Sequence, residues 1–358
     1  MDDIHVLAER PQVSESDVLR HFRAFKTPAH DFDACTANER ELMVHGLPRR
    51  PNRETHPRLA AKWDRIVAQQ RFEYIVPELK VLPRMRRSVD TDLLSRRSLF
   101  DRELGRYRDK LLLKTEFDRW NEIIGIIARL PETSTNWSGA YVKRPASEQI
   151  VTVTGEWRVP GVNPPASAWN GTGYNDGTYL CGVWVGIDGT QGTNDVMQAG
   201  TASQCVVQGG KFVSTSFFAW TEWFSLPSIS VVNFPVQVGD IISCTVCAPF
   251  GNTHGTAMFN NLTQNKTVNL GIDPPSGTTL VGNVAEWIVE DPGFIGGGLY
   301  PFPNYGSTYF NDCTAGTKNF ELDLGTGREI DLVDVANNVI SSGLIENNRT
   351  LFCRYGSA

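Results

Sequence analysis

The sequence lacks long apolar runs and is poor in cysteine and histidine. No stretch approaches the roughly 18 uninterrupted apolar residues of a membrane-spanning helix, so we expect no membrane contact. The opening residues Met1 to His5 show neither the basic region nor the apolar core of a signal peptide. The 7 cysteines are thinly spread, and Cys244 and Cys247 have no second cysteine pair or histidine cluster beside them. A zinc site is therefore not expected.

Histidine is almost confined to the first part of the chain, where five of the 6 histidines lie before residue 60. Only His254 remains for a catalytic triad in the later part, and it stands in a turn-like run where histidines are usually solvated. A phosphate-binding glycine loop is missing as well, because Gly296 to Gly298 is followed by no lysine or helix pattern. Carboxylates and amides remain as candidate catalytic groups, and no cofactor or metal is expected.

Charge divides the chain into two parts. The net charge is −6, which argues against nucleic acid as a partner, because phosphate binding requires a concentrated basic surface. Residues 1–130 carry +4 and residues 131–358 carry −10. Two units of opposite sign can bind one another. The plainer alternative is a permanently attached accessory domain with an ordinary solvated surface.

The first part, residues 1–132, has mostly helical periodicity. A capped helix start is predicted at Ser14, and a second helix over 36–45 with Thr36 and Glu39 as its capping box. Further helices are predicted from Leu59 to Phe72 and between Leu99 and Leu130.

From residue 133 to 358 the pattern changes to short strands separated by Gly, Pro and Asn clusters, without long helical interruptions. Such a pattern predicts an antiparallel sandwich or barrel. The clearest predicted strands are Gln149 to Val159, Tyr179 to Ile187, Val213 to Phe224, Ile241 to Cys247, Thr256 to Phe259, Val284 to Val289 and Thr308 to Phe310.

The strongest carboxylate candidate lies in the strand-like run that contains Glu286. Side chains alternate along a strand, so Glu286, Ile288 and Glu290 share one face while Trp287 and Val289 point to the other. In a sandwich the Trp/Val face would enter the core, which leaves the glutamates on a face available to substrate. The alternative is a pair of exposed glutamates on a solvated strand.

Taken together, several segments resemble the glutamic peptidases, the eqolisin family of acid proteases. The resemblance runs in order from about residue 134 to the C-terminus, and order and spacing make it specific. The matching residues are Asn136 to Ala140, Val153 to Gly155, Val159 and Pro160, Trp184 to Gly189, Gln198 and Gly200, Glu222 and Trp223, Gly239 and Asp240, Gly255 to Ala257, and Ala285 to Glu290.

The resemblance implies a fold and a site. The fold would be an all-β antiparallel β-sandwich of the lectin-like, concanavalin A-like kind, with the active site on a concave face. Gln198 and Glu286 fall on the family's catalytic positions. The substrate-binding residues are expected to be Trp184, Glu222, Trp137 and Asp188. Thr221 and Ala199 depart from frequent family residues, which bears on cleavage preference more than on reaction type.

The resemblance also implies how such an enzyme is made and used. Family members are typically precursors with a basic N-terminal propeptide, so residues 1–132 are expected to act as an intramolecular inhibitor. The expected partner is a peptide or protein substrate, the expected form is a monomer, and the expected location is extracellular. No signal peptide is visible to support that location.

A glutamate and an amide suffice for amide hydrolysis. An ionised Glu286 can take a proton from water as general base and return it to the leaving nitrogen as general acid. Gln198 can donate an N–H to the developing oxyanion. An unperturbed glutamate titrates near pH ~4, which favours an acidic working range.

Two alternatives stay open on the sequence. A lectin-like sandwich could bind carbohydrate without catalysis. A glycoside hydrolase could use Glu286 and Glu290, although their backbones would lie roughly 13 Å apart along the strand.

Overall fold

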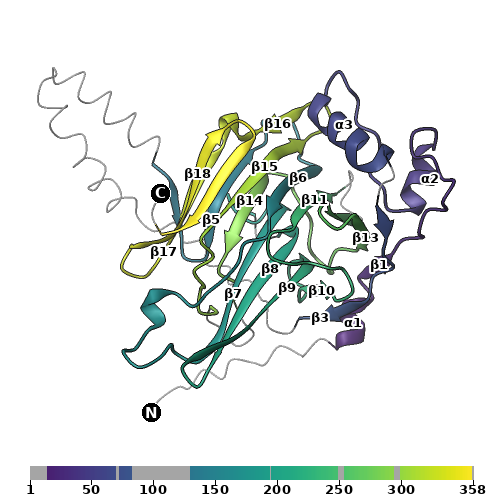
Figure 1. Ribbon diagram of the computed structural model, residues 1–358. Coiled ribbons are helices and arrows are strands. Elements are labelled where there is room, and N and C mark those ends of the chain that lie inside the picture. Colours follow the sequence, from purple (N-terminus) through teal and green to yellow (C-terminus); the bar gives the residue numbers. More distant parts are fainter. Residues whose placement is uncertain are drawn as a thin grey trace, which may run out of the picture.

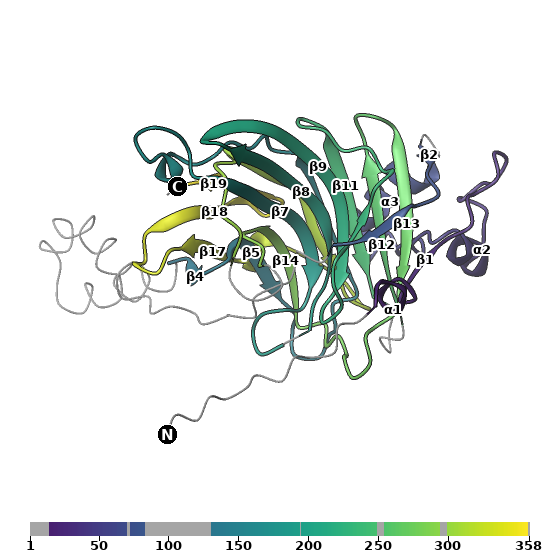
Figure 2. The ribbon, with the colours of Figure 1, turned by 90° about the horizontal axis from the view of Figure 1, so that it is seen from below.

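The computed structural model describes residues 14–69, 72–82, 130–193, 195–248, 254–293 and 299–356, and these residues form mainly antiparallel β-sheet. Figures 1 and 2 show the strands arranged as a sandwich, with the helices of the N-terminal segment at one side. Strand pairing divides the sandwich into two sheets joined by one pair of strands, and most pairs are antiparallel. The predicted β-sandwich is therefore confirmed.

The first sheet carries the candidate catalytic strands. Its strands, in their order across the sheet, are β3 (Leu79–Val81), β10 (Ile229–Val231), β9 (Lys211–Trp223), β8 (Met197–Gln208), β7 (Gly177–Ile187), β14 (Val284–Glu290), β5 (Trp137–Lys143), β17 (Arg328–Val333) and β18 (Val339–Asn347). β4 (Glu132–Ser134) lies parallel beside β17.

The second sheet begins where β18 pairs with β19. Its strands, in order, are β19 (Thr350–Tyr355), β15 (Ser307–Gly316), β6 (Thr152–Arg158), β11 (Ile241–Cys247), β12 (Gly255–Asn261), β13 (Lys266–Ile272) and β1 (Phe22–Ala24). β16 (Glu321–Asp323) pairs with β15, and β2 (Glu73–Tyr74) lies parallel beside β13.

The main core lies between the two sheets and includes the face of β14 that was predicted to be buried. Trp287 and Val289 belong to this core. The Trp287 indole N–H donates to the carbonyl of Thr154 on the second sheet at 2.9 Å, which satisfies a buried donor that would otherwise cost stability. Gly155 makes this packing fit, because a Cβ there would lie 3.0 Å from Cδ1 of Trp287.

A second apolar cluster covers the opposite face of the first sheet, which we call the site face. It contains Trp137, Tyr141, Leu180, Trp184, Ala202, Trp220, Val284, Ile288 and Ile330, all buried. Burial on both faces explains why β14 reads as a nearly continuous apolar run. The alternative of exposed glutamates on a solvated strand is wrong, because Glu286 and Glu290 are 0% and 3% exposed.

The described helices are short. They are α1 (Glu15–Leu19), α2 (Glu39–Val44), α3 (Pro57–Trp63), the π-turn η1 (Asp64–Ala68) and the 3₁₀ turns η2 (Ala166–Ala168) and η3 (Leu324–Thr326). Ser14 caps α1 as predicted. The predicted helix between Leu99 and Leu130 lies outside the described residues.

The predicted capping box of α2 is wrong, because the actual box lies two residues further along the chain. Asn38 and Glu41 make it instead, through the Glu41 N–H to Asn38 Oδ1 (3.1 Å) and the Asn38 N–H to Glu41 Oε2 (2.8 Å). Thr36 is engaged elsewhere, since its hydroxyl donates to Asp33. The helix expected from Leu59 begins two residues earlier at Pro57, where proline suits the first turn, and its last turn is η1.

The N-terminal segment contacts both sheets. α3 packs against β15 and β16, and an apolar cluster that includes Trp63 and Ile66 reaches Met258 on β12. The strands β1, β2 and β3 of the segment extend the sheets at their edges, which the sequence did not predict. Residues 14–82 are thus an attached mixture of short helices and strands, and a mostly helical segment is not confirmed.

Two further expectations concern the described residues alone. No helix among them is long and apolar enough to cross a membrane. All cysteines in the described ranges are free thiols, and none belongs to a group of side chains suited to hold a metal. Burial raises the pKa of the thiols of Cys181, Cys205 and Cys244, which keeps them protonated.

Candidate active site

The predicted catalytic pair lies in one transverse row of the first sheet. Glu286 on β14 pairs with Gly186 on β7, and Gly186 pairs in turn with Gln198 on β8. Residues directly opposite each other in antiparallel strands point to the same face, so Glu286 and Gln198 both lie on the site face. At about 4.8 Å between strands, their Cα atoms are about 10 Å apart. Side chains of this length can converge over the residue between them.

Gly186 makes that convergence feasible. A Cβ at this position would lie 2.8 Å from Cζ3 of Trp184 and 3.3 Å from Cβ of Gln198. A larger residue would therefore push against the Trp184 ring and occupy the space between the carboxyl and the amide. The glycine was part of a matching motif, but its place between the two catalytic candidates depends on strand register.

The pair is removed from solvent in the full chain. Glu286 is 0% exposed and Gln198 is 1% exposed. Oε1 of Gln198 is fully buried and accepts no hydrogen bond from the residues that the structure describes. Buried polar side chains nearly always find partners, so this amide oxygen is left available to a water molecule or a ligand.

Glu222 extends the same row on the other side of Gln198. It pairs directly with Gln198 across β8 and β9. The Ser228 hydroxyl donates a short hydrogen bond to Oε2 of Glu222, and the Thr221 hydroxyl donates to the backbone oxygen of Gln198 at 2.8 Å. These bonds orient Glu222 and hold β8 against β9, so the predicted substrate residue Glu222 does lie beside the pair.

Trp184 and Trp137 also lie on the site face, where Glu290 fixes both rings. The Trp137 and Trp184 indole N–H groups donate to Oε1 and Oε2 of Glu290 at 3.0 and 2.8 Å. The two rings meet edge to face with centroids 5.1 Å apart. Asn136 adds a longer bond to Glu290 at 3.4 Å. Glu290 therefore orients the rings of Trp137 and Trp184. The sequence did not reveal this role, although strand alternation placed Glu290 on the correct face.

Asp188, the remaining predicted substrate residue, is not brought to this row. Its carboxylate is buried and accepts four backbone N–H bonds from residues 281–284, the segment that leads into β14. Burial raises the pKa of Asp188, and these N–H groups oppose that rise. Its left-handed backbone (φ 64°) turns the chain directly after β7. The geometry gives Asp188 the task of anchoring the segment that positions Glu286.

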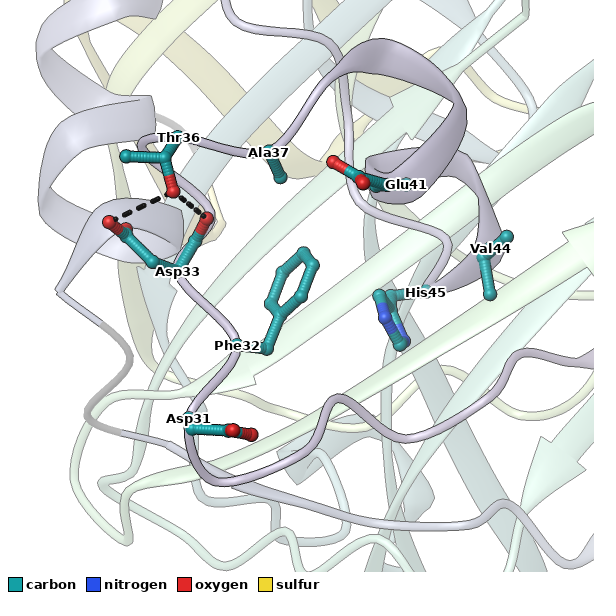
Figure 3. A pocket seen from close by; sticks show the side chains of 8 residues that line it. All are labelled: Asp31, Phe32, Asp33, Thr36, Ala37, Glu41, Val44 and His45. Atoms are coloured by element: carbon teal, nitrogen blue, oxygen red, sulfur yellow. Dashed lines mark hydrogen bonds between the residues drawn. The ribbon is translucent and has the colours of Figure 1, made fainter.

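An open pocket of about 470 Å³ lies elsewhere, in the N-terminal segment (Figure 3). Asp31, Asp33 and Glu41 contribute carboxylates to its wall. Inside it the rings of Phe32 and His45 pack edge to face, with their centroids 4.5 Å apart. None of the predicted site residues lines this pocket, so it does not compete with the row as the catalytic centre.

Comparison with known proteins identifies the family of this chain. Residues 135–355 match the model of the Peptidase A4 family. The chain is 32% identical over 194 residues to aspergillopepsin-2 of Aspergillus niger, covering 51% of this chain and 65% of that protein. It is 27% identical over 164 residues to scytalidopepsin B of Scytalidium lignicola, covering 46% and 54%. The chain thus matches less than two thirds of the length of either curated relative.

Solved structures show the same fold. Scytalido-glutamic peptidase with a transition state analog inhibitor aligns with a TM-score of 0.51 at 22% identity, covering 62% of this chain and 98% of that one. The same peptidase with a peptide based transition state analog aligns with a TM-score of 0.50 at 23% identity and the same coverage.

Proposed function

Because the chain belongs to the Peptidase A4 family, we propose that residues 133–358 form an acid-acting endopeptidase whose catalytic residues are Glu286 and Gln198. The observation that carries the proposal is the row in which these two side chains flank Gly186 on one face of a sheet. Trp184, Trp137 and Glu222 lie on that face and are proposed to contact the substrate. No metal or cofactor is required.

Each step of peptide hydrolysis has a group in this row. Glu286 removes a proton from water, and the hydroxide attacks the carbonyl carbon of the peptide bond. The amide N–H of Gln198 donates to the oxygen as negative charge develops there. Glu286 then returns the proton to the leaving nitrogen, so the products are a carboxylic acid and an amine. Buried surroundings strengthen both interactions, because little water competes for them.

The two other candidate functions fit the site less well. A glycoside hydrolase would need a second free carboxylate close to Glu286, but Glu290 is bound to two indole N–H groups and lies beyond Ile288 on the strand. A pure carbohydrate-binding sandwich gives no reason for the buried Gln198 oxygen, which has no hydrogen-bond partner among the described residues, to lie on the same face as the carboxyl group of Glu286.

Digestion of a denatured protein tests the proposed function. We expect the purified chain to cleave casein at about pH 3–4 and to be nearly inactive at pH 7, because the family resemblance and a catalytic glutamate both favour acid. Mass spectrometry of the peptides and of the enzyme itself measures cleavage and any processing. Binding to a glycan array without casein cleavage would instead support the carbohydrate-binding alternative.

We further propose that residues 1–132 hold the enzyme in a latent form, and that the protein acts as a monomer in an acidic extracellular setting. Ion pairs between the segment and the sandwich support the attachment that latency requires: Arg65 to Glu156 (2.5 Å) and Asp312 (2.9 Å), Lys62 to Glu156 (3.4 Å), and Arg23 to Asp273 (2.5 Å). Of the described helices, α2 and α3 pack on the second sheet, and α1 contacts β1 and β3 at the edge of the core between the sheets. Among residues 14–69 and 72–82, β3 is the strand that pairs with the first sheet, so it is the described part of the segment through which inhibition can reach the site.

Glu156 gives this attachment a predictable pH dependence. Burial favours its neutral form, but the charges of Lys62 and Arg65 hold the pKa of Glu156 below its ordinary value. A carboxyl with a lowered pKa stabilises the attached state above its unperturbed pKa of about 4.3, and that contribution is lost as pH falls through the lowered pKa. Acid should therefore loosen the segment.

Glu156→Gln is expected to raise the pH at which the segment detaches by about one unit, because the variant lacks the charge at every pH. Limited proteolysis of α3 across pH 2–7, followed by mass spectrometry, measures detachment. Glu346→Gln, on an exposed position of β18, serves as the control and should leave the midpoint unchanged. If E156Q and the parent chain detached at the same pH midpoint, Glu156 would not control the pH dependence of the attachment.

A further inference from the structure

The N-terminal segment reaches the first sheet as an added β-strand. β3 runs antiparallel to β10, with Lys80 opposite Ser230. Two backbone bonds bracket the pairing: the Leu82 N–H donates to the Ser228 oxygen at 2.8 Å, and the Val232 N–H donates to the Glu78 oxygen at 2.9 Å. Among the described residues, β3 is the partner of β10 on this side, so β10 would be an edge strand without it.

The added strand divides its side chains between the two faces of the sheet. Leu79 and Val81 pack against the core between the sheets. Leu82 packs on the site face, against the cluster that contains Trp184 and Trp220. Lys80 is exposed. A hydrophobic residue of the segment therefore enters the apolar surface that surrounds the catalytic pair.

Leu82 also lies at the end of the transverse row that contains Gln198 and Glu286. The backbone oxygen of Ser228 accepts from the Leu82 N–H, and the hydroxyl of Ser228 donates to Glu222. Glu222 pairs with Gln198, and Gly186 lies between Gln198 and Glu286. At about 4.8 Å per strand, Leu82 lies three strands, about 14 Å, from Gln198 and five strands, about 24 Å, from Glu286.

We propose that the edge of β10 from Ser228 to Val232 is a docking site for extended polypeptide substrates, and that residues 78–82 occupy it in the full chain. This inference rests on the proposed peptidase function. A substrate bound in the direction of β3 would pair with β10, place one apolar side chain where Leu82 lies, and then cross Glu222 toward the catalytic pair. Main-chain bonds give such strand addition its affinity, and the pocket for one side chain gives it specificity.

The geometry determines on which side of the cleaved bond the docking residues of the substrate lie, and how many residues separate them from that bond. β3 runs toward the row in its N-to-C direction, so the docking residues precede the cleaved bond. The span of about 14–24 Å corresponds to roughly four to seven extended residues at about 3.3 Å each. The existing occupant is weakly held, since β3 has three residues and none of them is fully buried. An edge that loses this partner retains unpaired N–H and C=O groups that favour a replacement strand.

Three peptides with the same sequence around one cleaved bond test the proposal in the full chain at acid pH. One carries about eight residues before the bond, one carries the same number after it, and one is short on both sides. We expect the N-extended peptide alone to show a higher kcat/KM than the short one. An equal or greater gain for the C-extended peptide would overturn the proposal.

Val232→Pro removes the N–H that faces this edge, at a position that is 53% exposed. The ratio of kcat/KM between the N-extended and short peptides should fall about tenfold, as expected for one lost backbone hydrogen bond. The ratio is the measure because weaker docking of β3 would raise both rates together. Val232→Ala keeps the N–H and should keep the ratio. An unchanged ratio in V232P would refute the docking edge.

Hydrogen exchange separates this inference from the proposed chemistry, because it needs no turnover. In the full-length Glu286→Gln chain, the N-extended peptide should speed exchange of the amides of residues 78–82 while residues 228–232 stay protected. Protection of 78–82 that the peptide does not alter would overturn the docking site even if the chain is an active peptidase. A chain that cleaves none of the peptides but shows this exchange pattern would keep the docking site and lose the peptidase function.

Discussion

Glu286→Gln is expected to lower kcat for peptide cleavage at about pH 3–4 by roughly 10³- to 10⁴-fold, with KM changed much less. The substitution keeps the size of a side chain that is 0% exposed but removes the group that accepts and returns the proton. Loss of kcat with little change in KM indicates an interaction made in the transition state. Initial rates on a fluorogenic peptide, measured at several acid pH values, provide the test.

The control for this variant must change a carboxylate without touching the row. Glu346→Gln does so on an exposed strand position and should retain the parental rate. Circular dichroism should show the same β-rich spectrum for both variants. If E286Q with an intact spectrum turned over substrate within tenfold of the parent chain, Glu286 would not be the catalytic base.

Features of this site that depend on neighbouring residues in the sequence could be predicted, and features that depend on the pairing of distant strands could not. The faces of β14 could be predicted, because alternation along a strand is local: Trp287 entered the core and Glu286 the opposite face. The convergence of Glu286 with Gln198 could not be predicted from alternation. It depends on β7 lying between β14 and β8 with Gly186 in register, and the family resemblance alone pointed to the pair.

Asp188 shows a second limit of prediction from the sequence. Its motif follows Trp184 and Gly186 directly, so proximity in sequence suggested proximity to the substrate. The left-handed backbone at Asp188 instead directs the carboxylate to four backbone N–H groups of residues 281–284. A buried anion satisfied in this way is a structural anchor. The sequence contains no pattern that separates the two roles.

The N-terminal segment shows a third limit, which concerns short elements. β1 and β3 have three residues each and β2 has two, too few for any periodicity to be recognised. Their pairing partners lie far away in the sequence. The opposite charges of the two parts correctly suggested contact, since Arg65 and Lys62 meet Glu156, but charge could not predict that β3 reaches the site face.

Gln198→Ala is expected to lower kcat by about 10²- to 10³-fold, which is the usual cost of losing one oxyanion donor. The variant also removes a buried amide with an atom that has no partner among the described residues. The folded state should therefore lose little stability, and the thermal midpoint should stay close to that of the parent chain. A large loss of rate with an unchanged midpoint separates a catalytic role from a structural one.

The pH profile distinguishes the two members of the pair. An amide does not titrate, so Q198A should reduce the rate equally at every acid pH, whereas the shape of the profile belongs to Glu286. Gln204→Ala, on β8 six residues further along and on the same face, is the matched control and should leave the rate near that of the parent chain. If Q198A changed the shape of the profile while keeping the maximal rate, Gln198 would tune the glutamate through its environment, and the oxyanion would require another donor.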